Sequence, residues 1–447
     1  MDKKITRSWG GVHISKSWQF NPVNEEEAVS LFDMNDEYGV IPRGSGNSYG
    51  DQALNSEGGI VSIQDFSEHT ELPITTEGSV SVHGGTSYAT LLTASVKQGW
   101  IMPVVPGSKS ITIGGAIAAD AHGKNHFHKS SISSYIIDID LLTAKGSVVR
   151  CNRSHEPELF WATIGGLGLT GLILKATVQL EEIRSNQLIV KSEKFSDFAG
   201  LIDRFNTAAL NHSYCVAWLD LLSKTKPGRG IIQSADPASA SSKALSYESP
   251  QSVSIPKLLP FNLLNKASCG AFNAVKFYGH PSRMQQNSML IEKFLHPLDR
   301  VRNWNNLYGR KGFFQWQIVV PETEEYFLEE VISKLGDLPL LPSLAVLKRL
   351  GVESGSYLSF CKPGWTLAVD FPFESESSRS LLNNFDKRLA EIGGRIYLAK
   401  DGGMNPELLN VMYPRLGDWK RVRKEYDPEN IWQSNFSRRL KLHDPQS

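Results

Sequence analysis

Two glycine-bearing segments carry the strongest chemical signal in the sequence. They are Pro42-Arg-Gly-Ser-Gly-Asn-Ser-Tyr-Gly-Asp51 and Val105-Pro-Gly-Ser-Lys-Ser-Ile-Thr-Ile-Gly-Gly-Ala116. Each follows a β-branched, strand-like stretch, and each offers backbone N–H groups that no large side chain obstructs. Unpaired amides in a turn or at a helix N-terminus form a concave site that attracts anions. One such loop is more often a plain turn. Two of them, followed by Asp120-Ala-His122-Gly-Lys-Asn125, predict a pyrophosphate held from two sides.

A third glycine motif, Gly166-Leu-Gly-Leu-Thr-Gly171, matches the GxGxxG fingerprint of dinucleotide-binding domains letter for letter. That fingerprint must follow a strand and open a helix. Here an expected helix precedes the motif and an expected strand follows it, so we reject it as a Rossmann site. Its glycines can still let the backbone approach a ligand closely.

Short helices and strands alternate between residues 20 and 180, and these elements must position the two loops. Asn24 can cap a helix whose first turn is acidic, and Thr86 or Ser87 can cap another. We expect helices over 25–32, 87–98 and 156–163, and strands over 40–41, 79–83, 136–142, 148–149 and 172–180. The order is an α+β pattern rather than a regular βαβ repeat.

The character of the chain changes near residue 182. Residues 223–260 are rich in Ser, Lys, Pro and Gly, which predicts a mobile loop. The apolar segment 255–264 can dock on its own domain, which we favour, or meet a membrane or a lipid tail. Strands are expected over 312–320 and 365–371, and a helical tail from residue 395 with a capped end at Asp427.

Composition excludes several classes of protein. The 447 residues carry 47 basic and 47 acidic side chains, so no basic excess indicates nucleic acid as a partner. The length predicts two or three domains. Four cysteines are scattered without a CxxC pair, which argues against a metal site or a disulfide framework and favours a reducing compartment. The N-terminal residues lack the apolar core of a signal peptide, so we expect a soluble, cytoplasmic protein.

Three N-terminal segments together resemble the PCMH-type FAD-binding domain of the vanillyl-alcohol oxidase superfamily: RGSGNSYGD (43–51), PGSKSITIGGAIAADAHGKNHF (106–127) and ELFWATIGGLGLTG (158–171). The C-terminal motifs are similar to those of the decaprenylphosphoryl-β-D-ribose 2-oxidase family. They are Tyr308-Gly, Gln315-Trp-Gln317, Pro363-Gly-Trp365, Val369-Asp-Phe-Pro372, Tyr397-Leu-Ala-Lys-Asp401, Met412-Tyr-Pro-Arg415 and Arg438-Arg-Leu440. The likeness covers nearly the whole chain and is weakest over 223–260 and 322–355.

The resemblance implies an α+β architecture with FAD between two subdomains. Residues 1–181 would form the FAD-binding domain, and residues 182–394 a substrate domain built on an antiparallel sheet, with the mobile loop at about 223–260. Residues 395–447 would return to the FAD domain.

The resemblance also implies which residues contact FAD. Many family members tether the flavin through a histidine at the place of Asn47; an amide is no nucleophile, so we expect FAD to be non-covalent and dissociable. The implied contacts are Pro42, Arg43, Gly44, Ser45, Gly46, Asn47, Ser48, Tyr49, Gly50, Asp51, Gln52, Gly107, Thr112, Ile113, Gly114, Gly115, Ala119, Asp120, Ala121, His122, Ile173 and Tyr397.

Lys400 matches the family's lysine near flavin and substrate, where it would act as a base or bind an anion. On its own it would more often be a surface lysine paired with Asp401. With Lys400 we assign His122, as a hydrogen-bond or proton-relay partner, and Tyr49 to the catalytic group. His122, His126 and His128 could indicate a metal, but no carboxylate or cysteine has suitable spacing, so we expect none.

Gln315 and Gln317 lie on one side of an expected strand, where two amides suit sugar hydroxyls; a solvent-facing strand edge is the equal alternative. The resemblance places Tyr308 and Lys348 near the sugar phosphate. Ala368 replaces the family's cysteine, and Thr366 stands where asparagine is usual. Alanine cannot form a thiol adduct, and the altered wall puts the identity of the sugar in question.

These observations predict an FAD-dependent oxidoreductase that converts a sugar hydroxyl to a keto group. The preferred substrate is the 2-hydroxyl of a polyprenyl-phosphate-linked ribose, as the first half of an epimerisation that an NAD(P)H-dependent short-chain reductase would complete. Such a lipid would bring the enzyme to the inner membrane face as a peripheral protein. Two alternatives stay open: an aldonolactone oxidase or dehydrogenase of the same superfamily, and a non-catalytic flavin-binding subunit.

Overall fold

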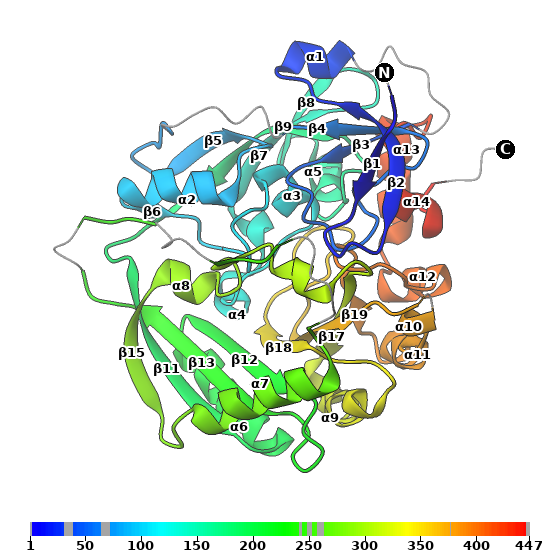
Figure 1. The fold of residues 1–447 in the computed structure, drawn as a ribbon. Helices are drawn as coiled ribbons and strands as arrows, with labels where there is room; N and C mark the ends of the chain where they lie inside the picture. Colours follow the sequence, from blue (N-terminus) through cyan, green and yellow to red (C-terminus); the bar gives the residue numbers. More distant parts are fainter. Residues whose placement is uncertain are drawn as a thin grey trace.

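The computed structural model describes residues 2–30, 39–63, 72–240, 244–247, 253–256, 263–375 and 377–443. Within these ranges the chain builds two four-stranded sheets at one end of the molecule and an eight-stranded sheet at the other (Figure 1). Helices and strands alternate irregularly along the chain, so the α+β class is confirmed. The C-terminal helices run along one side and reach both ends.

The N-terminal four-stranded sheet carries the first glycine loop at the end of one strand. Its order is β1-β2-β4-β3, and β3 and β4 run parallel. The bounds are Lys4–Arg7 (β1), Ile14–Phe20 (β2), Val40–Arg43 (β3) and Gly59–Ser62 (β4). Asn24 caps α1 (Glu25–Ser30) by accepting from the Glu27 N–H at 2.8 Å. The expected end of this helix, residues 31–32, lies outside the described residues.

The second four-stranded sheet is antiparallel, in the order β5-β9-β7-β8. It comprises Ser79–His83 (β5), Ile136–Leu142 (β7), Val148–Asn152 (β8) and Leu172–Gln179 (β9), and its helices are Tyr88–Lys97 (α2), Ile113–Ala118 (α3), His126–Lys129 (α4) and Pro157–Thr163 (α5). The predicted strands and helices of this region are confirmed. Ser87 caps α2, whose Leu91, Leu92 and Val96 are buried on one face, so amphipathic periodicity set this helix.

The eight-stranded sheet has the order β15-β11-β13-β12-β18-β19-β17-β20, and its neighbouring strands run antiparallel. Its strands are Gln187–Phe195 (β11), Tyr214–Asp220 (β12), Arg229–Pro237 (β13), Gln285–Leu290 (β15), Phe313–Pro321 (β17), Leu344–Leu350 (β18), Gly364–Pro372 (β19) and Arg395–Ile396 (β20).

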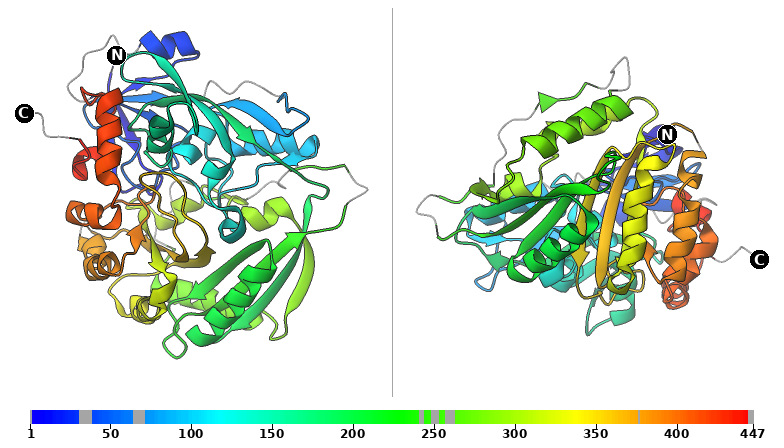
Figure 2. Two further views of the ribbon diagram at one scale, coloured as in Figure 1. Left: turned by 180° about the vertical axis from the view of Figure 1, so that it is seen from behind. Right: turned by 90° about the horizontal axis from the view of Figure 1, so that it is seen from below.

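Helices cover both faces of this sheet. One face packs against α6 (Phe198–Asn211), α9 (Glu325–Lys334) and α11 (Asn383–Glu391) in the largest apolar cluster of the protein. On the opposite face, α7 (Lys266–Gly279) covers β12 and β13, so that α6 and α7 lie on opposite sides of these strands (Figure 2, right). The rest of this sheet face, which α7 does not cover, is directed towards the two smaller sheets.

Of two expectations for the region after residue 222, one needs correction and the other lies mostly outside the described residues. The mobile loop predicted over 223–260 is wrong for 229–237, because β13 is an inner strand of the sheet. Its buried Arg229 is paired with Asp220 at 2.8 Å, which lets a polar sequence enter the sheet. Residues 241–243, 248–252 and 257–262, which include most of the apolar segment 255–264, lie outside the described residues.

The tail is also not helical from residue 395. Arg395 and Ile396 form β20, which pairs with Val319 and Ile318 of β17 and therefore joins the eight-stranded sheet. Helices resume at Leu409–Met412 (α12), Leu416–Tyr426 (α13) and Asn435–Arg439 (α14). Asp427 is the C-cap residue of α13, as expected. The turn between β20 and α12 carries Lys400. The domain boundaries at 181 and 394 stay predictions, and the second one separates β20 from its sheet.

Candidate active site

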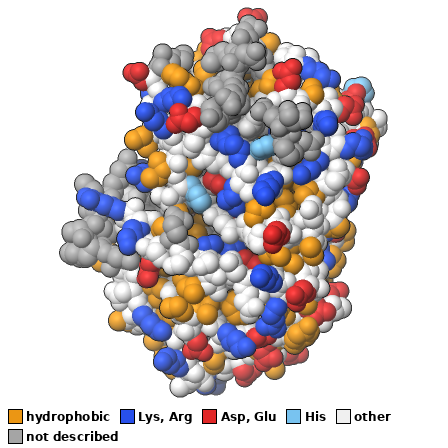
Figure 3. Space-filling view, turned by 90° about the vertical axis from the view of Figure 1, so that its right-hand side faces the viewer, with side chains coloured by type: hydrophobic (Ala, Val, Ile, Leu, Met, Phe, Trp, Pro, Cys, Tyr) orange, Lys and Arg blue, Asp and Glu red, His pale blue; other side chains and the backbone are white. Residues whose placement is uncertain are grey.

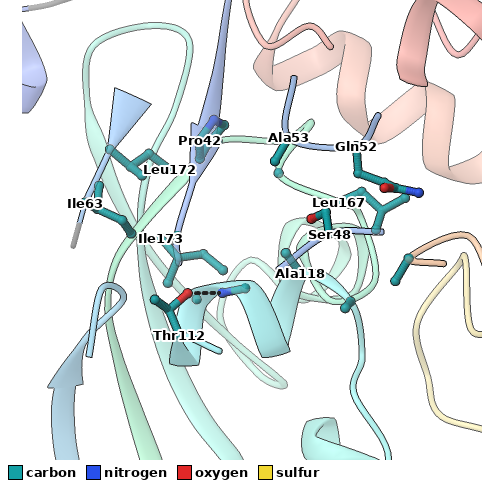
Figure 4. A pocket seen from close by; sticks show the side chains of 17 residues that line it. Pro42, Ser48, Gln52, Ala53, Ile63, Thr112, Ala118, Leu167, Leu172 and Ile173 are labelled. Carbon is teal, nitrogen blue, oxygen red and sulfur yellow. Dashed lines mark hydrogen bonds between the residues drawn. The ribbon is translucent and has the colours of Figure 1, made fainter. Parts of the chain in front are cut away.

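A cavity opens between the two four-stranded sheets, beside the first glycine loop (Figure 4). Its wall combines the end of β3, this loop, the start of α3 and the glycine-rich segment between α5 and β9. The lining residues are Pro42, Gly44, Ser48, Gln52, Ala53, Ile63, Thr112, Gly114, Gly115, Ala118, Ala119, Leu167, Gly168, Gly171, Leu172, Ile173 and Ala399. The rejected GxGxxG motif thus lines a cavity after all, with Gly168 and Gly171, but between a helix and a strand.

The first glycine loop presents unused backbone donors to this cavity. Within the described part of the chain, no backbone carbonyl accepts from the amides of Ser45 to Ser48. A run of such donors is suited to a phosphate or pyrophosphate group. Asn47 donates its side-chain N–H to Ser110 Oγ at 2.8 Å, which ties the first loop to the second.

The second loop differs from this expectation. The Ile113 and Gly114 amides donate to Thr86 O and Gly84 O, each at 2.8 Å, and the Gly115 amide donates to Thr112 Oγ1 at 3.1 Å. The prediction of a pyrophosphate held by the amides of both loops is therefore wrong for these amides, because the protein already uses them.

The glycines of the second loop serve close packing instead. A β-carbon at Gly114 would lie 3.0 Å from Gly84 O, and one at Gly44 of the first loop would lie 2.2 Å from Thr112 Oγ1. Side chains at these places would push β5, α3 and the first loop apart, and would narrow the cavity between them.

The C-terminal turn reaches the end of the first loop. Gln52 donates its amide N–H to Leu398 O and Asp401 O, both at 2.6 Å, and Arg439 of α14 binds Asp51 at 2.8 Å and Asp401 at 3.0 Å. A β-carbon at Gly50 would lie 2.1 Å from Asp401 O, so this approach requires glycine. Asp401 therefore pairs with Arg439, and the alternative of a surface Lys400–Asp401 pair is wrong.

The cavity fits a dinucleotide on two further observations. The buried Gln52 Oε1 has no hydrogen-bond partner among the described residues, which leaves an acceptor for a hydroxyl of a bound group. Ala399 also lines the cavity, so the end of the cavity at Ala399 lies next to Lys400 in the chain. With the free amides of the first loop, these features would hold FAD.

The side chains at that end come from one face of the eight-stranded sheet. Gln315 and Gln317 of β17 stand opposite Asp370 and Ala368 of β19, and Lys348 of β18 stands opposite Thr366. Because side chains alternate between the faces of a strand, all of these residues lie on the side that faces the glycine loops. The predicted placement of both glutamines on one side is confirmed, and neither is at a free sheet edge.

Lys400 lies against the first loop, with its Nζ 3.6 Å from the centre of the Tyr49 ring. Burial lowers the pKa of Lys400 to about 7; Asp370 opposes this shift, and Lys348 reinforces it. An amine with such a pKa is partly neutral at physiological pH and can accept a proton. Burial also holds the pKa of Tyr49 well above its usual range, so its hydroxyl stays protonated.

Asp370 is a site residue that sequence reasoning missed. Its Oδ1 accepts from Gln315 Nε2 at 2.6 Å, whereas its buried Oδ2 has no partner among the described residues. Burial raises the pKa of Asp370 to about 6, against the influence of Gln315 and Lys400. A lone carboxylate in the otherwise uncharged strand 364–372 was the signal that could have identified it.

His122 lies between Lys348 and Gln317. Its Nδ1 is 3.2 Å from Lys348 Nζ, and its Nε2 is 3.0 Å from the side-chain nitrogen of Gln317. Burial and the charge of Lys348 hold the pKa of His122 well below its usual range, so the ring is neutral. Gln317 also donates to Thr366 Oγ1 at 3.1 Å, where the family usually has asparagine.

Lys348 and Lys400 lie within electrostatic reach of each other at this end, and Lys124 lies near Lys348 but donates to Phe294 O. Burial lowers the pKa of Lys348 to about 8, and burial together with Lys348 lowers the pKa of Lys124 to about 7. Each of these lysines would regain its charge beside an anion. Tyr308 completes the wall, because its ring stacks on Phe313 at 4.1 Å, and Phe313 contacts the edge of Tyr49 at 5.4 Å.

Several of the predicted contact residues have partners within the protein. Arg43 donates to Ala53 O and Arg7 O, the Ile113 side chain is buried in the core, and Tyr397 donates to Ala119 O at 2.7 Å. Gly107 is not among the residues that line the cavity, and the carboxylate of Asp51 is taken by Arg439. His126 accepts from the Gly351 amide, and His128 contacts Ala209 O. The lining residues that sequence reasoning missed are Ala53, Ile63, Ala118, Leu167, Leu172 and Ala399.

Comparison with known proteins supplies independent evidence. Residues 19–152 match the model of an FAD binding domain, and residues 366–440 match that of D-arabinono-1,4-lactone oxidase. The chain is 34% identical to a decaprenylphosphoryl-β-D-ribose oxidase of Mycolicibacterium smegmatis over 90% of this chain and 89% of that protein. It is 33% identical to an uncharacterized protein of Streptomyces coelicolor over 77% of this chain and 96% of that protein. A D-arabinono-1,4-lactone oxidase of Candida glabrata is 27% identical over 42% of this chain and 37% of its own length.

Proposed function

The chain belongs to the decaprenylphosphoryl-β-D-ribose oxidase family of FAD-dependent oxidoreductases, and from that premise we propose that it oxidises the 2-hydroxyl of a polyprenyl-phosphate-linked ribose to a keto group. The cofactor is FAD, for which the cavity along the first glycine loop is suited. What we propose is the identity of the substrate, which combines a sugar, a phosphate and a lipid.

One observation carries this choice of substrate. Lys348 lies beside His122 and within electrostatic reach of Lys400, and burial depresses the pKa of both lysines. A charged Lys348 is unfavourable in this low-dielectric region until an anion enters, because burial disfavours its ammonium form. A phosphodiester supplies that anion, whereas an aldonolactone is neutral. The two glutamines can bind the sugar hydroxyls.

The side chains divide the work of the reaction. Bound FAD would supply the acceptor for the hydride from the carbon that is oxidised. Lys400, held over Tyr49, accepts the proton of the substrate hydroxyl, and its pKa of about 7 suits this role. Gln315 orients the hydroxyl while it holds Asp370, and neutral His122 positions Lys348 and Gln317. Lys348 binds the phosphate.

Anaerobic flavin reduction tests the proposal directly. We expect farnesyl-phosphoryl-ribose to bleach the flavin absorbance, and its 2-deoxy analogue to bind without bleaching. Free ribose should react poorly, because it lacks the anion. Equal bleaching by ribose and by the phosphodiester would contradict the assigned role of Lys348, and a substrate panel that leaves the flavin oxidised throughout would favour the non-catalytic subunit.

Aldonolactone oxidation is the second candidate, since residues 366–440 match the D-arabinono-1,4-lactone oxidase model. This range holds Thr366, Ala368, Asp370 and Lys400, which are the residues next to the reacting atoms in our proposal. D-Arabinono-1,4-lactone therefore belongs in the same panel. Faster bleaching by this lactone than by the phosphodiester would reverse our order of preference.

Three further features follow from the proposal. The keto-sugar needs a separate NAD(P)H-dependent short-chain reductase if it is to become the epimer, and the lipid brings the protein to the inner membrane face. FAD binds without a covalent bond, because Asn47 donates to Ser110 and has no nucleophilic atom. Gel filtration of the denatured protein checks this point: the yellow colour should separate from the polypeptide.

A further inference from the structure

The outward side of α7 is apolar, which is the reverse of a usual surface helix. Phe272, Val275 and Tyr278 are exposed by 61%, 73% and 69%, and they recur every three residues along one side. The inward side buries Cys269, Asn273 and Phe277. Phe277 packs against Trp218 and Ile231, and Asn273 donates to Asp220 at 2.8 Å. The helix is therefore anchored, and its exposed apolar side is fixed in place. We call Phe272, Val275 and Tyr278 the α7 face.

The stretch of sequence that contains the α7 face carries charge of one sign. No acidic residue occurs from 249 to 291, although the chain has 47 of them, and the same stretch contains Lys257, Lys266, Lys276 and Arg283. By contrast, basic and acidic side chains are interspersed on the side of the molecule where the C-terminal helices lie (Figure 3). An apolar stripe with flanking cations and no acidic residue has the chemistry that binds anionic lipid surfaces.

The α7 face also lies close to the sugar end of the site. In the apolar cluster under α7, Phe277 and Trp218 meet Leu344, and Leu344 stands opposite Asp370 in the sheet register. Cys269 of α7 is near enough to Tyr308 to influence its pKa, which burial raises well above the usual range. Helix α7 runs along the outside of the molecule in two views (Figures 1 and 2). Among the described residues, no helix has the length and hydrophobicity to cross a bilayer.

We propose that the α7 face docks the protein on the surface of an anionic phospholipid membrane, next to the entrance for the lipid-linked sugar. This inference rests on the proposed function, because the lipid part of the substrate gives the docking its purpose. Phe272 and Val275 enter the boundary between head groups and acyl chains, and Lys266 contacts the phosphates, whereas the Lys276 ammonium lies over the Trp218 ring. The polyprenyl chain would then remain in the bilayer while the ribose reaches Gln315 and Lys400.

Vesicle co-sedimentation tests the docking with the FAD-loaded full chain. Vesicles of phosphatidylglycerol and phosphatidylcholine in equal parts should pellet the wild-type protein, and vesicles of phosphatidylcholine alone should pellet much less. The double variant Phe272→Ser/Val275→Ser should lose at least about tenfold in partition coefficient. The control Tyr326→Ser/Val411→Ser removes side chains that are similarly exposed, by 61% and 57%, on other helices, and it should partition as the wild type does.

Each contrary outcome overturns the docking. Equal partition of the two double variants would do so, as would a wild-type protein that stays in the supernatant. A change from dimer to monomer in the α7 variant, without vesicle binding by the wild type, would assign the face to a protein partner. Turnover of soluble farnesyl-phosphoryl-ribose by the α7 variant separates the two proposals: unchanged turnover with lost vesicle binding supports both. Vesicle binding without turnover by any variant would remove the proposed substrate alone.

Discussion

The two faces of the eight-stranded sheet are made by the same strands and have opposite roles. The face towards α6, α9 and α11 contains Trp316, Ile318 and Leu367, all buried in one apolar cluster. The face towards the glycine loops contains Gln315, Gln317 and Asp370. Gln315 donates to Asp370, and Gln317 contacts His122. Adjacent residues along β17 therefore belong to different chemical environments, because side chains alternate with a period of two.

This difference shows how the sheet separates stability from reactivity. The packing face gains free energy from apolar burial. Among the described residues, Asp370 on the site face has a carboxylate oxygen without a hydrogen-bond partner, and this face carries lysines whose pKa values burial has lowered. Such groups reduce stability, and they persist where the fold supplies compensation elsewhere. Substitutions on the two faces should consequently affect different measurements.

Lys400→Ala should produce the largest effect, and it should appear in kinetics rather than in stability. Loss of the proton acceptor is expected to slow flavin reduction by about 10²–10⁴-fold, while the flavin spectrum remains unchanged. Stopped-flow reduction under anaerobic conditions measures this rate. Lys362→Ala, a lysine that contacts Gly393 O on the surface, is the control and should reduce its flavin normally. A flavin-free Lys400→Ala protein would show that the lysine holds the cofactor instead.

Leu367→Ala tests the packing face of the same strand. Leu367 is fully buried, so its truncation should lower the free energy of unfolding by about 2–5 kcal/mol through lost burial and a new cavity. Urea unfolding measures this change. The folded fraction should reduce flavin at close to the wild-type rate. A strong fall in that rate at unchanged stability would contradict the separation of the two faces.

Asp370→Asn should shift the pH dependence of the site face. For a proton acceptor with a pKa of about 7, flavin reduction at low substrate rises as the pH increases through 7. Asp370 raises the pKa of Lys400, so its loss should move this rise to lower pH and cost roughly tenfold in rate at the optimum. The pH profile of reduction, measured for both proteins, decides the matter. A rate that falls as the pH increases through 7 would identify Lys400 as an anion binder.

Ala368→Cys should have the smallest effect on folding, because Ala368 stands opposite Gln317 on the partly open site face. The change in stability should be below about 1.5 kcal/mol. The new thiol should react with a thiol-directed probe, and prior binding of a phosphodiester substrate should protect it. Mass spectrometry of the intact protein measures the adduct. Labelling that is indifferent to substrate would place residue 368 away from the bound sugar.

Much of the N-terminal half followed from local signals. The cap at Ser87, the alternation of 79–83 and the glycines after Thr163 each act within a few residues, so the sequence alone predicted the elements around them. The strand β13 escaped prediction, because its Arg229 is paired with Asp220 of β12, which also accepts from Asn273 of α7. Pairing between residues that are distant in the sequence produces no periodic pattern of apolar residues along the strand.

The site residues also divide into those that the sequence predicted and those that only the tertiary structure identifies. Lys400, Gln315 and Gln317 were predicted, the lysine through a family resemblance and the glutamines through strand period. Asp370 gains its meaning only when β17 brings Gln315 beside it and the C-terminal turn brings Lys400. The second glycine loop misled for a related reason: Thr86 and Gly84, which lie on a neighbouring segment, take the amides that the loop alone would leave free.

The clasp of Arg439 on Asp51 and Asp401 has a consequence for biosynthesis. The polypeptide completes its flavin-facing loop 388 residues before the arginine that fastens this loop to the lysine turn. This arginine contact between the loop and the turn is therefore absent from any nascent chain that has not yet reached residue 439.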